Sequence, residues 1–280
     1  MTSLTLGLVA AFCWGLHDIT IRYLSRSAPM MGCLLCVLLI GSVFQASALI
    51  ATGAEPVTAT GITLSVLAGL AFLAANVGLY FSFARGPVRL VTPIIACFSV
   101  ISVAIALVEG ATLSLTQAAA IAALLAGIAI VGFSTPEDDT TFPPMGPTIG
   151  FAVLAAFGFA ATFKLGQMAA EVSGELETTL IARLTAFTAL AAVLVLRAQP
   201  ILPRRGALWP LIGMGVLDST AILAVISAAP LPNPEYAAVA TSTFGLLTIV
   251  LAWALLKERM SGAQWAGCLI AFASVGWLAL

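Results

Sequence analysis

Long apolar runs alternate with short polar breaks along the 280 residues of this chain. A bilayer core about 30 Å thick requires roughly 20 apolar helical residues per crossing, and each run is about that long. A helix also satisfies its own backbone hydrogen bonds inside lipid, so the pattern predicts an all-α integral membrane protein. The ten predicted membrane helices are Thr5 to Leu24, Met30 to Ala51, Ile62 to Ala84, Val88 to Val108, Leu115 to Phe133, Thr148 to Ala170, Thr178 to Leu196, Ala207 to Ala228, Pro234 to Leu256, and Gly262 to Leu280.

The longest polar break lies near the middle of the chain and separates two groups of five predicted helices. It comprises residues 135–147 and contains three acidic residues and four prolines. We therefore predict a first domain at residues 1–134, a linker at 135–147 and a second domain at 148–280.

Sequence features recur in the same order in both halves. The segment AAFCWG at 10–15 matches AAFGFA at 155–160, and Glu109, Ser114 and Gln117 match Glu258, Ser261 and Gln264. A half with an odd number of helices obliges the next half to enter the membrane from the opposite side. The sequence thus predicts two inverted five-helix repeats, an arrangement in which transporters place the substrate site between the halves.

Composition excludes several classes of protein. Charged residues make up 8% of the chain and hydrophobic residues 61%, whereas a soluble domain carries about 25% charged residues. The net charge is −1 and no basic face is present, so nucleic acid is not an expected partner. The five cysteines lie in apolar stretches where no metal-ligand partner is apparent, and the C-x-x-C spacing of Cys33 and Cys36 falls inside a continuous apolar run, so we expect neither metal nor cofactor.

Charges in the predicted loops indicate an orientation. Nine cations fall on one side of the membrane: Arg22, Arg26, Arg85, Arg89, Arg197, Arg204, Arg205, Lys257 and Arg259. The other side carries Glu55, Glu109, Glu171, Glu175, Glu177 and Glu235. The positive-inside rule makes the arginine side cytoplasmic, which places both termini outside.

Ionisable residues inside the predicted helices are the first candidates for function, because a charge near the bilayer centre is costly. They are His17, Asp18, Lys164, Arg183 and Asp218. His17, Asp18 and Asp218 are candidates for proton coupling, although Asp18 also has the spacing for an ion pair with Arg22. Arg183 and Asp218 are predicted to lie at a similar depth in the membrane, with Lys164 slightly further along. This placement is compatible either with binding of a zwitterionic substrate or with a salt bridge between these side chains.

Aromatic and small polar residues complete the predicted cavity. Besides His17, Lys164, Arg183 and Asp218, the residues predicted to bind the substrate are Trp14, Asn76, Tyr80, Phe98, Ser99, Phe163 and Ser242, with Phe159 close by. Trp14 lies in mid-span, where its indole N–H needs a partner, whereas Ser and Thr often bond to their own backbone. Pro93 predicts a kink in one half only, because Ser242 occupies the matching position.

Two motifs carry a family resemblance, and the second of them is duplicated. Trp14-Gly15 followed by Arg22, and the E…S-x-x-Q pattern in both halves, resemble the EamA repeats of the drug/metabolite transporter superfamily. The resemblance implies a proton- or gradient-coupled carrier with a central cavity in a bacterial inner membrane, and its relatives include exporters of amino acids and other metabolites. The chain departs from the family pattern at Cys36, where an arginine is common, and in its charge-based orientation.

The sequence therefore predicts a secondary transporter that exports amino acids or related small metabolites by alternating access. We expect a monomer whose partners are a small-molecule substrate, lipid and protons. The alternatives are a multidrug or lipophilic-cation exporter, which Lys164 and Arg183 beside Asp218 disfavour, and a channel. An enzyme is not expected, because the single histidine leaves few catalytic pairs and no zinc or nucleotide motif occurs.

Overall fold

The computed structural model describes residues 2–24, 29–85, 88–134, 144–198, 207–256 and 261–278. Within its helices, the side chains of Arg22, Arg89, Pro93 and a few apolar residues lie outside the description. Regular structure in the described ranges is helical, without a strand. Six of the helices are long and apolar enough to cross a membrane by length and composition.

In the described ranges, twelve helices occupy the predicted segments. They are α1 (Ser3–Leu24), α2 (Met30–Thr52), α3 (Ala59–Arg85), α4 (Val88–Ala96), α5 (Phe98–Val108), α6 (Leu115–Phe133), α7 (Met145–Ser173), α8 (Glu175–Leu196), α9 (Leu208–Ile226), α10 (Glu235–Thr241), α11 (Phe244–Leu256) and α12 (Gly262–Leu278). The predicted linker was too long at its C-terminal end, since residues 145–147 already belong to α7. Linker residues 135–143 lie outside the described ranges.

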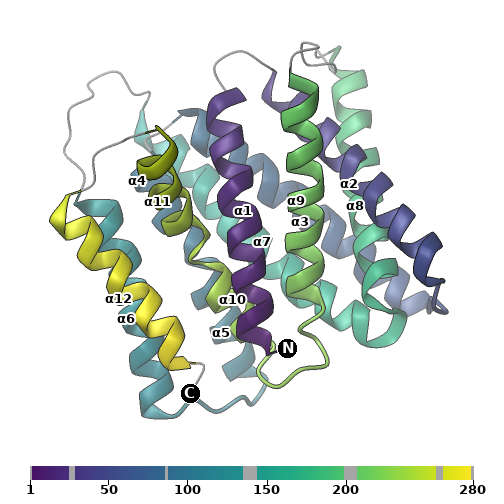
Figure 1. Cartoon of the computed structure of the whole chain (residues 1–280). Helices are drawn as coiled ribbons and strands as arrows, with labels where there is room; N and C mark the ends of the chain where they lie inside the picture. Colours follow the sequence, from purple (N-terminus) through teal and green to yellow (C-terminus); the bar gives the residue numbers. More distant parts are fainter. Residues whose placement is uncertain are drawn as a thin grey trace.

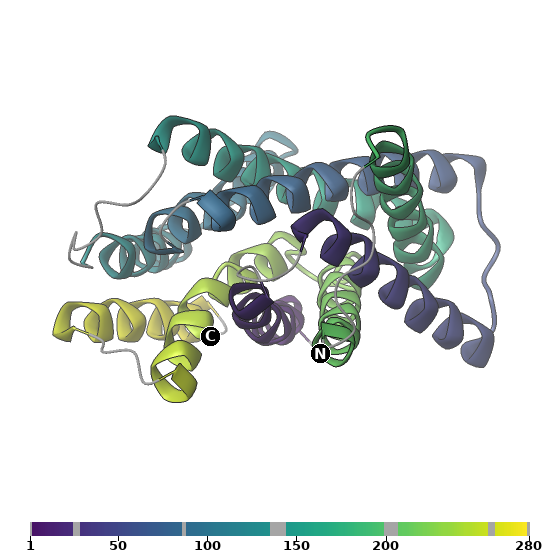
Figure 2. The same cartoon turned by 90° about the horizontal axis from the view of Figure 1, so that it is seen from above.

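The helices form one elongated bundle with both chain ends at the same end of the helices (Figure 1). The pair α6 and α12 stands at one flank and the pair α2 and α8 at the other. Between them, α3 and α7 pack along one side, while α1 and α9 pack together on the opposite side (Figure 2). The larger of two apolar cores lies among these central helices, and the smaller one links α6 and α12 to α10.

Both halves contain a broken helix, which corrects the expectation of a kink in one half only. The first break is at Cys97 between α4 and α5, and the second is at residues 242–243 between α10 and α11. In each break an amide bonds three residues back, from Cys97 N to Ile94 O at 3.2 Å and from Thr243 N to Ala240 O at 3.2 Å. A tightened turn of this kind interrupts the α-helix without requiring a proline at that place.

The duplicated S-x-x-Q motif forms a helix cap in both halves. The Gln117 amide donates to the Ser114 hydroxyl at 3.2 Å, and the Ser114 amide donates to the Gln117 side chain at 2.9 Å. Ser261 and Gln264 make the same two bonds at the start of α12, at 3.2 and 2.8 Å respectively. These reciprocal bonds satisfy amides that a helix N-terminus leaves unpaired. Glu258, which precedes the second motif, lies outside the described residues.

Small residues bring α3 and α7 into close contact. A Cβ atom added at Gly158 would lie 2.8 Å from the backbone of Ala75, so the two helices approach almost backbone to backbone. Close approach of this kind is how membrane helices gain packing energy, because lipid gives them no hydrophobic drive to associate. Gly150 lies on the same helix, and a Cβ atom there would meet nothing within 4 Å.

This contrast predicts opposite effects of two equal substitutions in α7. Gly158→Ala should lower the melting temperature of the detergent-purified protein, because overpacking costs about 1–3 kcal/mol. Gly150→Ala should leave the melting temperature unchanged or raise it, since alanine favours a helix by about 1 kcal/mol. Thermal unfolding followed by size-exclusion fluorescence measures both. Equal melting temperatures for the two variants would contradict the close packing of α3 on α7.

Candidate functional site

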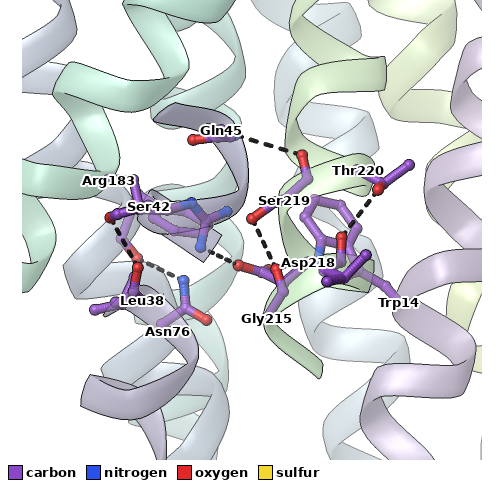
Figure 3. Close-up of polar contacts among 12 residues, drawn as sticks. Trp14, Leu38, Ser42, Gln45, Asn76, Arg183, Gly215, Asp218, Ser219 and Thr220 are labelled. Carbon is purple, nitrogen blue, oxygen red and sulfur yellow. Dashed lines mark hydrogen bonds and ion pairs between the residues drawn. The ribbon is translucent and has the colours of Figure 1, made fainter. Parts of the chain in front are cut away.

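A buried carboxylate lies where the central helices meet. Asp218 of α9 is 2% exposed, and its two oxygens accept from different helices. The Trp14 indole donates to Oδ1 at 2.9 Å, and Arg183 Nη1 donates to Oδ2 at 2.7 Å (Figure 3). Trp14 thus has the polar partner that its mid-span position required, and the predicted depth match of Arg183 with Asp218 is a direct ion pair.

The Arg183 guanidinium is buried on α8 at 1% exposure. It lies over the Phe72 ring of α3, with Cζ 5.4 Å from the ring centroid. Its Nε and Nη2 atoms have no hydrogen-bond partner among the described residues. Since an arginine presents five donors, the edge that faces away from Asp218 retains unused binding capacity.

Gly41 of α2 makes room for this pair. A Cβ atom at Gly41 would come within 2.3 Å of the Ser219 hydroxyl and 2.7 Å of Arg183 Nη1. Any larger residue would displace the arginine from Asp218. Five helices, α1, α2, α3, α8 and α9, therefore converge on one ion pair.

A second ionisable pair lies one turn along α1 from Trp14. His17 Nδ1 and Asp18 Oδ1 are 3.1 Å apart, and both side chains are buried. The His17 ring meets the Tyr80 ring of α3 edge-on at 6.4 Å. Within the described residues, His17 Nε2, Asp18 Oδ2 and the Tyr80 hydroxyl have no partner. The Arg22 side chain, the predicted alternative partner of Asp18, lies outside the description.

Aromatic rings separate this polar group from the α5 side of the bundle. Phe98 contacts Phe159, Phe163 and Phe244, with ring centroids 6.0, 5.4 and 6.4 Å apart. Trp14 contacts Phe159 at 5.6 Å and Phe163 at 5.8 Å. Phe98 begins α5 and Phe244 begins α11, so each follows a helix break directly.

These groups enclose a narrow central cavity of about 310 Å³. Its wall consists of Trp14, His17, Asp18, Asn76, Leu79, Phe98, Phe159, Asp218 and Phe244. Two carboxylates, one imidazole and four aromatic rings therefore face the same space. Carboxylates and aromatic faces both attract cations, so the cavity wall suits an ammonium group.

Lys164 does not accompany Asp218, which corrects the sequence-based expectation. Its ammonium group instead forms an ion pair with Glu109 at the end of α5. This pair lines a separate cavity of about 400 Å³ and is partly exposed. Lys164 therefore gives no reason to disfavour a cationic substrate at Asp218. Through this ion pair Glu109 contacts helix α7.

The small polar candidates hydrogen-bond mainly to their own helices. The Asn76 amide donates to Phe72 O at 2.9 Å, although this side chain also lines the central cavity. The Ser99 hydroxyl donates to Ala96 O at 2.8 Å and the Ser242 hydroxyl to Val239 O at 2.7 Å. Both serines are buried beside a helix break, where these bonds stabilise the tightened turns.

Sequence reasoning missed several residues around the site. Phe72 and Gly41 contact Arg183, and Phe244 completes the aromatic wall. An isolated Phe or Gly in an apolar run carries no signal in a single sequence. Phe244, by contrast, directly follows the Thr241–Thr243 cluster, and recognising a helix break there would have indicated it. No cluster of metal-ligating side chains occurs in the ranges that the structure describes.

Comparisons with known proteins agree with this architecture. Residues 146–280 match the EamA-like transporter family. A solved crystal structure superposes with a TM-score of 0.80 and 15% sequence identity, over 99% of this chain and 96% of the other. At that identity the likeness concerns the fold alone. No curated protein sequence gives a significant match. The resemblance inferred from the sequence is thus confirmed, because the second half of the chain, residues 146–280, matches the EamA-like transporter family.

Proposed function

We propose that the protein is a secondary transporter that exports small ammonium-bearing metabolites, amino acids in particular, across a bacterial inner membrane. The observation that carries the proposal is the Asp218 carboxylate, which is buried in the wall of a cavity at the meeting point of the central helices. In this proposal the substrate ammonium binds Asp218 among the aromatic rings. Arg183 does not line the cavity, so a movement of the Arg183–Asp218 pair would have to bring its unused Nε and Nη2 donors to the substrate carboxylate.

Charge balance favours a zwitterion as the substrate. The Arg183–Asp218 pair is neutral as a unit, so an amino acid can enter the cavity without changing the net charge of the site. A buried net charge is costly. A lipophilic cation would add one positive charge, which the second carboxylate of the cavity wall, Asp18, would have to offset.

A lipophilic-cation exporter is the second candidate, and one observation favours it. Four aromatic rings and two carboxylates line the cavity, while neither Lys164 nor Arg183 does. This wall resembles an aromatic cage for organic cations. The two candidates therefore differ in whether a substrate carboxylate contributes to binding.

We further propose that alternating access arises from two inverted five-helix repeats, residues 1–134 and 148–280, with ten membrane crossings in a monomer. Support comes from the exchange of packing partners between halves. Helix α1 packs on α9 as α7 packs on α3, and α1 packs on α10 and α11 as α7 packs on α4 and α5. Both chain ends also lie at the same end of the bundle, as an even number of crossings requires (Figure 1).

The proposed coupling site consists of His17, Asp18 and Asp218. An imidazole can carry a proton on either ring nitrogen, and His17 Nε2 has no partner among the described residues. A proton bound in this group and the substrate at Asp218 would occupy one small cavity. Because the proton and the substrate could not occupy this cavity together, entry of a proton would accompany exit of the substrate.

Counterflow tests the carrier proposal. Proteoliposomes preloaded with an unlabelled amino acid, chosen by a growth screen against toxic amino acids and analogues, should take up the labelled amino acid faster than empty ones. Asp218→Asn should reduce this uptake at least about tenfold, since a charged hydrogen bond contributes about 1.5–3 kcal/mol. Glu171→Gln, at the exposed end of α7, is the matched control. Equal uptake with and without preloading would indicate a pore, and normal counterflow in Asp218→Asn would refute the binding role.

Removing one partner of a buried pair costs about 3–5 kcal/mol in stability, and both Asp218→Asn and Arg183→Ala do so. The melting temperature of Asp218→Asn is therefore measured beside its counterflow, and counterflow is compared at a temperature at which the variant is folded. Arg183→Ala, which also removes the side chain that lies over Phe72, is expected to fold poorly.

A different prediction separates coupling from binding. His17→Gln should retain counterflow, which needs no net proton movement, but should lose most efflux driven by a pH gradient. The measurement compares the two modes in the same proteoliposomes, with a proton uncoupler as reference. The wild type is expected to lose gradient-driven efflux when uncoupler is added. Its efflux rate in the presence of uncoupler is therefore the rate expected of a fully uncoupled variant. A His17→Gln variant that keeps uncoupler-sensitive efflux would remove His17 from the coupling site.

The orientation of the chain is tested directly by fusions at its ends. Arg85 ends α3 and Arg197 follows α8, whereas Glu55, Glu175 and Glu235 belong to the opposite end of the helices. The positive-inside rule then places both termini outside. Alkaline phosphatase at the C-terminus should be active, and a fluorescent protein that folds only in the cytoplasm should stay dark. The reverse pattern would show that both termini are cytoplasmic.

A further inference from the structure

The larger cavity, away from the Arg183–Asp218 pair, is a second candidate binding site. We call it the vestibule. It holds about 400 Å³ and lies between α5, α7 and α10, lined by Ser102, Ile105, Ala106, Glu109, Phe163, Lys164, Gln167, Pro234, Glu235 and Ala238. Three charged side chains of both signs therefore share one cavity with an apolar floor.

Its charges are arranged for a solute that carries both signs. Lys164 pairs with Glu109, and its side chain is 33% exposed, so water and solutes reach it. Glu235 lines the same cavity, and its carboxylate has no hydrogen bond or ion pair among the described residues. Lys164 can bind a carboxylate while Glu235 receives an ammonium group, and the pairing of Lys164 with Glu109 keeps the empty cavity from holding an isolated cation.

The wall between the vestibule and the central cavity is aromatic. Phe163 lines the vestibule, and its ring lies 5.8 Å from Trp14 and 5.4 Å from Phe98, which both line the central cavity. The two cavities are thus separated by one layer of rings. Gln167 links the vestibule side of α7 to α9 and to the start of α10, because its amide donates to Val225 O at 3.1 Å and to Pro234 O at 3.4 Å.

We propose that the vestibule is a second, weaker solute site that binds zwitterionic amino acids through Lys164 and Glu235. It lies at the acidic end of the bundle and one aromatic layer away from Asp218, on the path by which a solute would leave the central cavity. The direction of passage rests on the proposed function. Binding in the vestibule does not, and it can be measured without transport.

Photo-crosslinking distinguishes the two cavities. The probe is photo-leucine, an amino acid with a diazirine side chain, and its comparator is the corresponding amine without the carboxylate. The full-length protein in nanodiscs is irradiated with either probe, and labelled residues are mapped by mass spectrometry. Photo-leucine should label residues 102–109, 163–167 and 234–238, in addition to the wall of the central cavity.

Two substitutions assign the charges. Lys164→Met should lower vestibule labelling by photo-leucine about fivefold, as expected for the loss of one partly exposed charge contact, without lowering labelling by the amine. Glu235→Gln should lower vestibule labelling by both probes. Glu171→Gln makes the same change of charge as Glu235→Gln but lies outside the vestibule, on the same helix as Lys164. This variant should be labelled like the wild type. Equal melting temperatures establish that the variants are folded.

Asp218→Asn separates this inference from the proposed function. Vestibule labelling should persist in this variant while labelling of the central cavity falls. Labelling of the central cavity alone, or vestibule labelling that neither Lys164→Met nor Glu235→Gln changes, would overturn the second site and leave the proposed function standing. Vestibule labelling without any central labelling would support the second site and contradict substrate binding at Asp218.

Discussion

The buried ion pair between Arg183 and Asp218 is the constraint on which the arrangement of the central helices depends. Removing two charges from water costs several kcal/mol for each, and close geometry with further donors has to offset that cost. Asp218 obtains a second donor from Trp14, while Arg183 lies against the Phe72 ring and passes the bare backbone of Gly41. Movement of any one of the five helices that converge there disturbs a bond to this pair.

The pair also limits how the site can work. A substrate ammonium that reaches Asp218 competes with Arg183 and Trp14 for the same two oxygens, so binding and helix arrangement are coupled through one carboxylate. If Arg183 were released from Asp218 inside the bundle, its positive charge would need another anion. A substrate carboxylate would provide that anion and keep the site neutral. The Nε and Nη2 donors of Arg183 have no partner among the described residues, so a substrate carboxylate could bind there before Arg183 leaves Asp218.

Hydropathy predicted where the helices lie, because lipid forces every crossing segment to be apolar and helical. Pro93 predicted a kink in the first half, but nothing in the sequence predicted the break in the second half, since Ser242 and Thr243 are compatible with a continuous helix and only the packed state favours the tightened turn. The ionisable candidates were identified only from the free-energy cost of placing a charge inside the membrane. That argument identified both Arg183 and Asp218. It failed for Lys164, because depth along a helix does not tell which face a side chain occupies. On α7, Lys164 points to Glu109 and the neighbouring Phe163 to Trp14.

The two helix breaks connect these observations. Each break shifts the helix that follows it, and the first residue after each is a phenylalanine whose ring enters the aromatic wall. Phe98 and Phe244 stack at 6.4 Å with their planes 20° apart, so the two broken helices meet at the central cavity through these rings. The serines and threonines at the breaks, first considered as ligands, donate to backbone carbonyls and keep the turns tight. A continuous helix at either place would rotate its phenylalanine away from the cavity, and the wall that separates Asp218 from the vestibule would lose one of its rings.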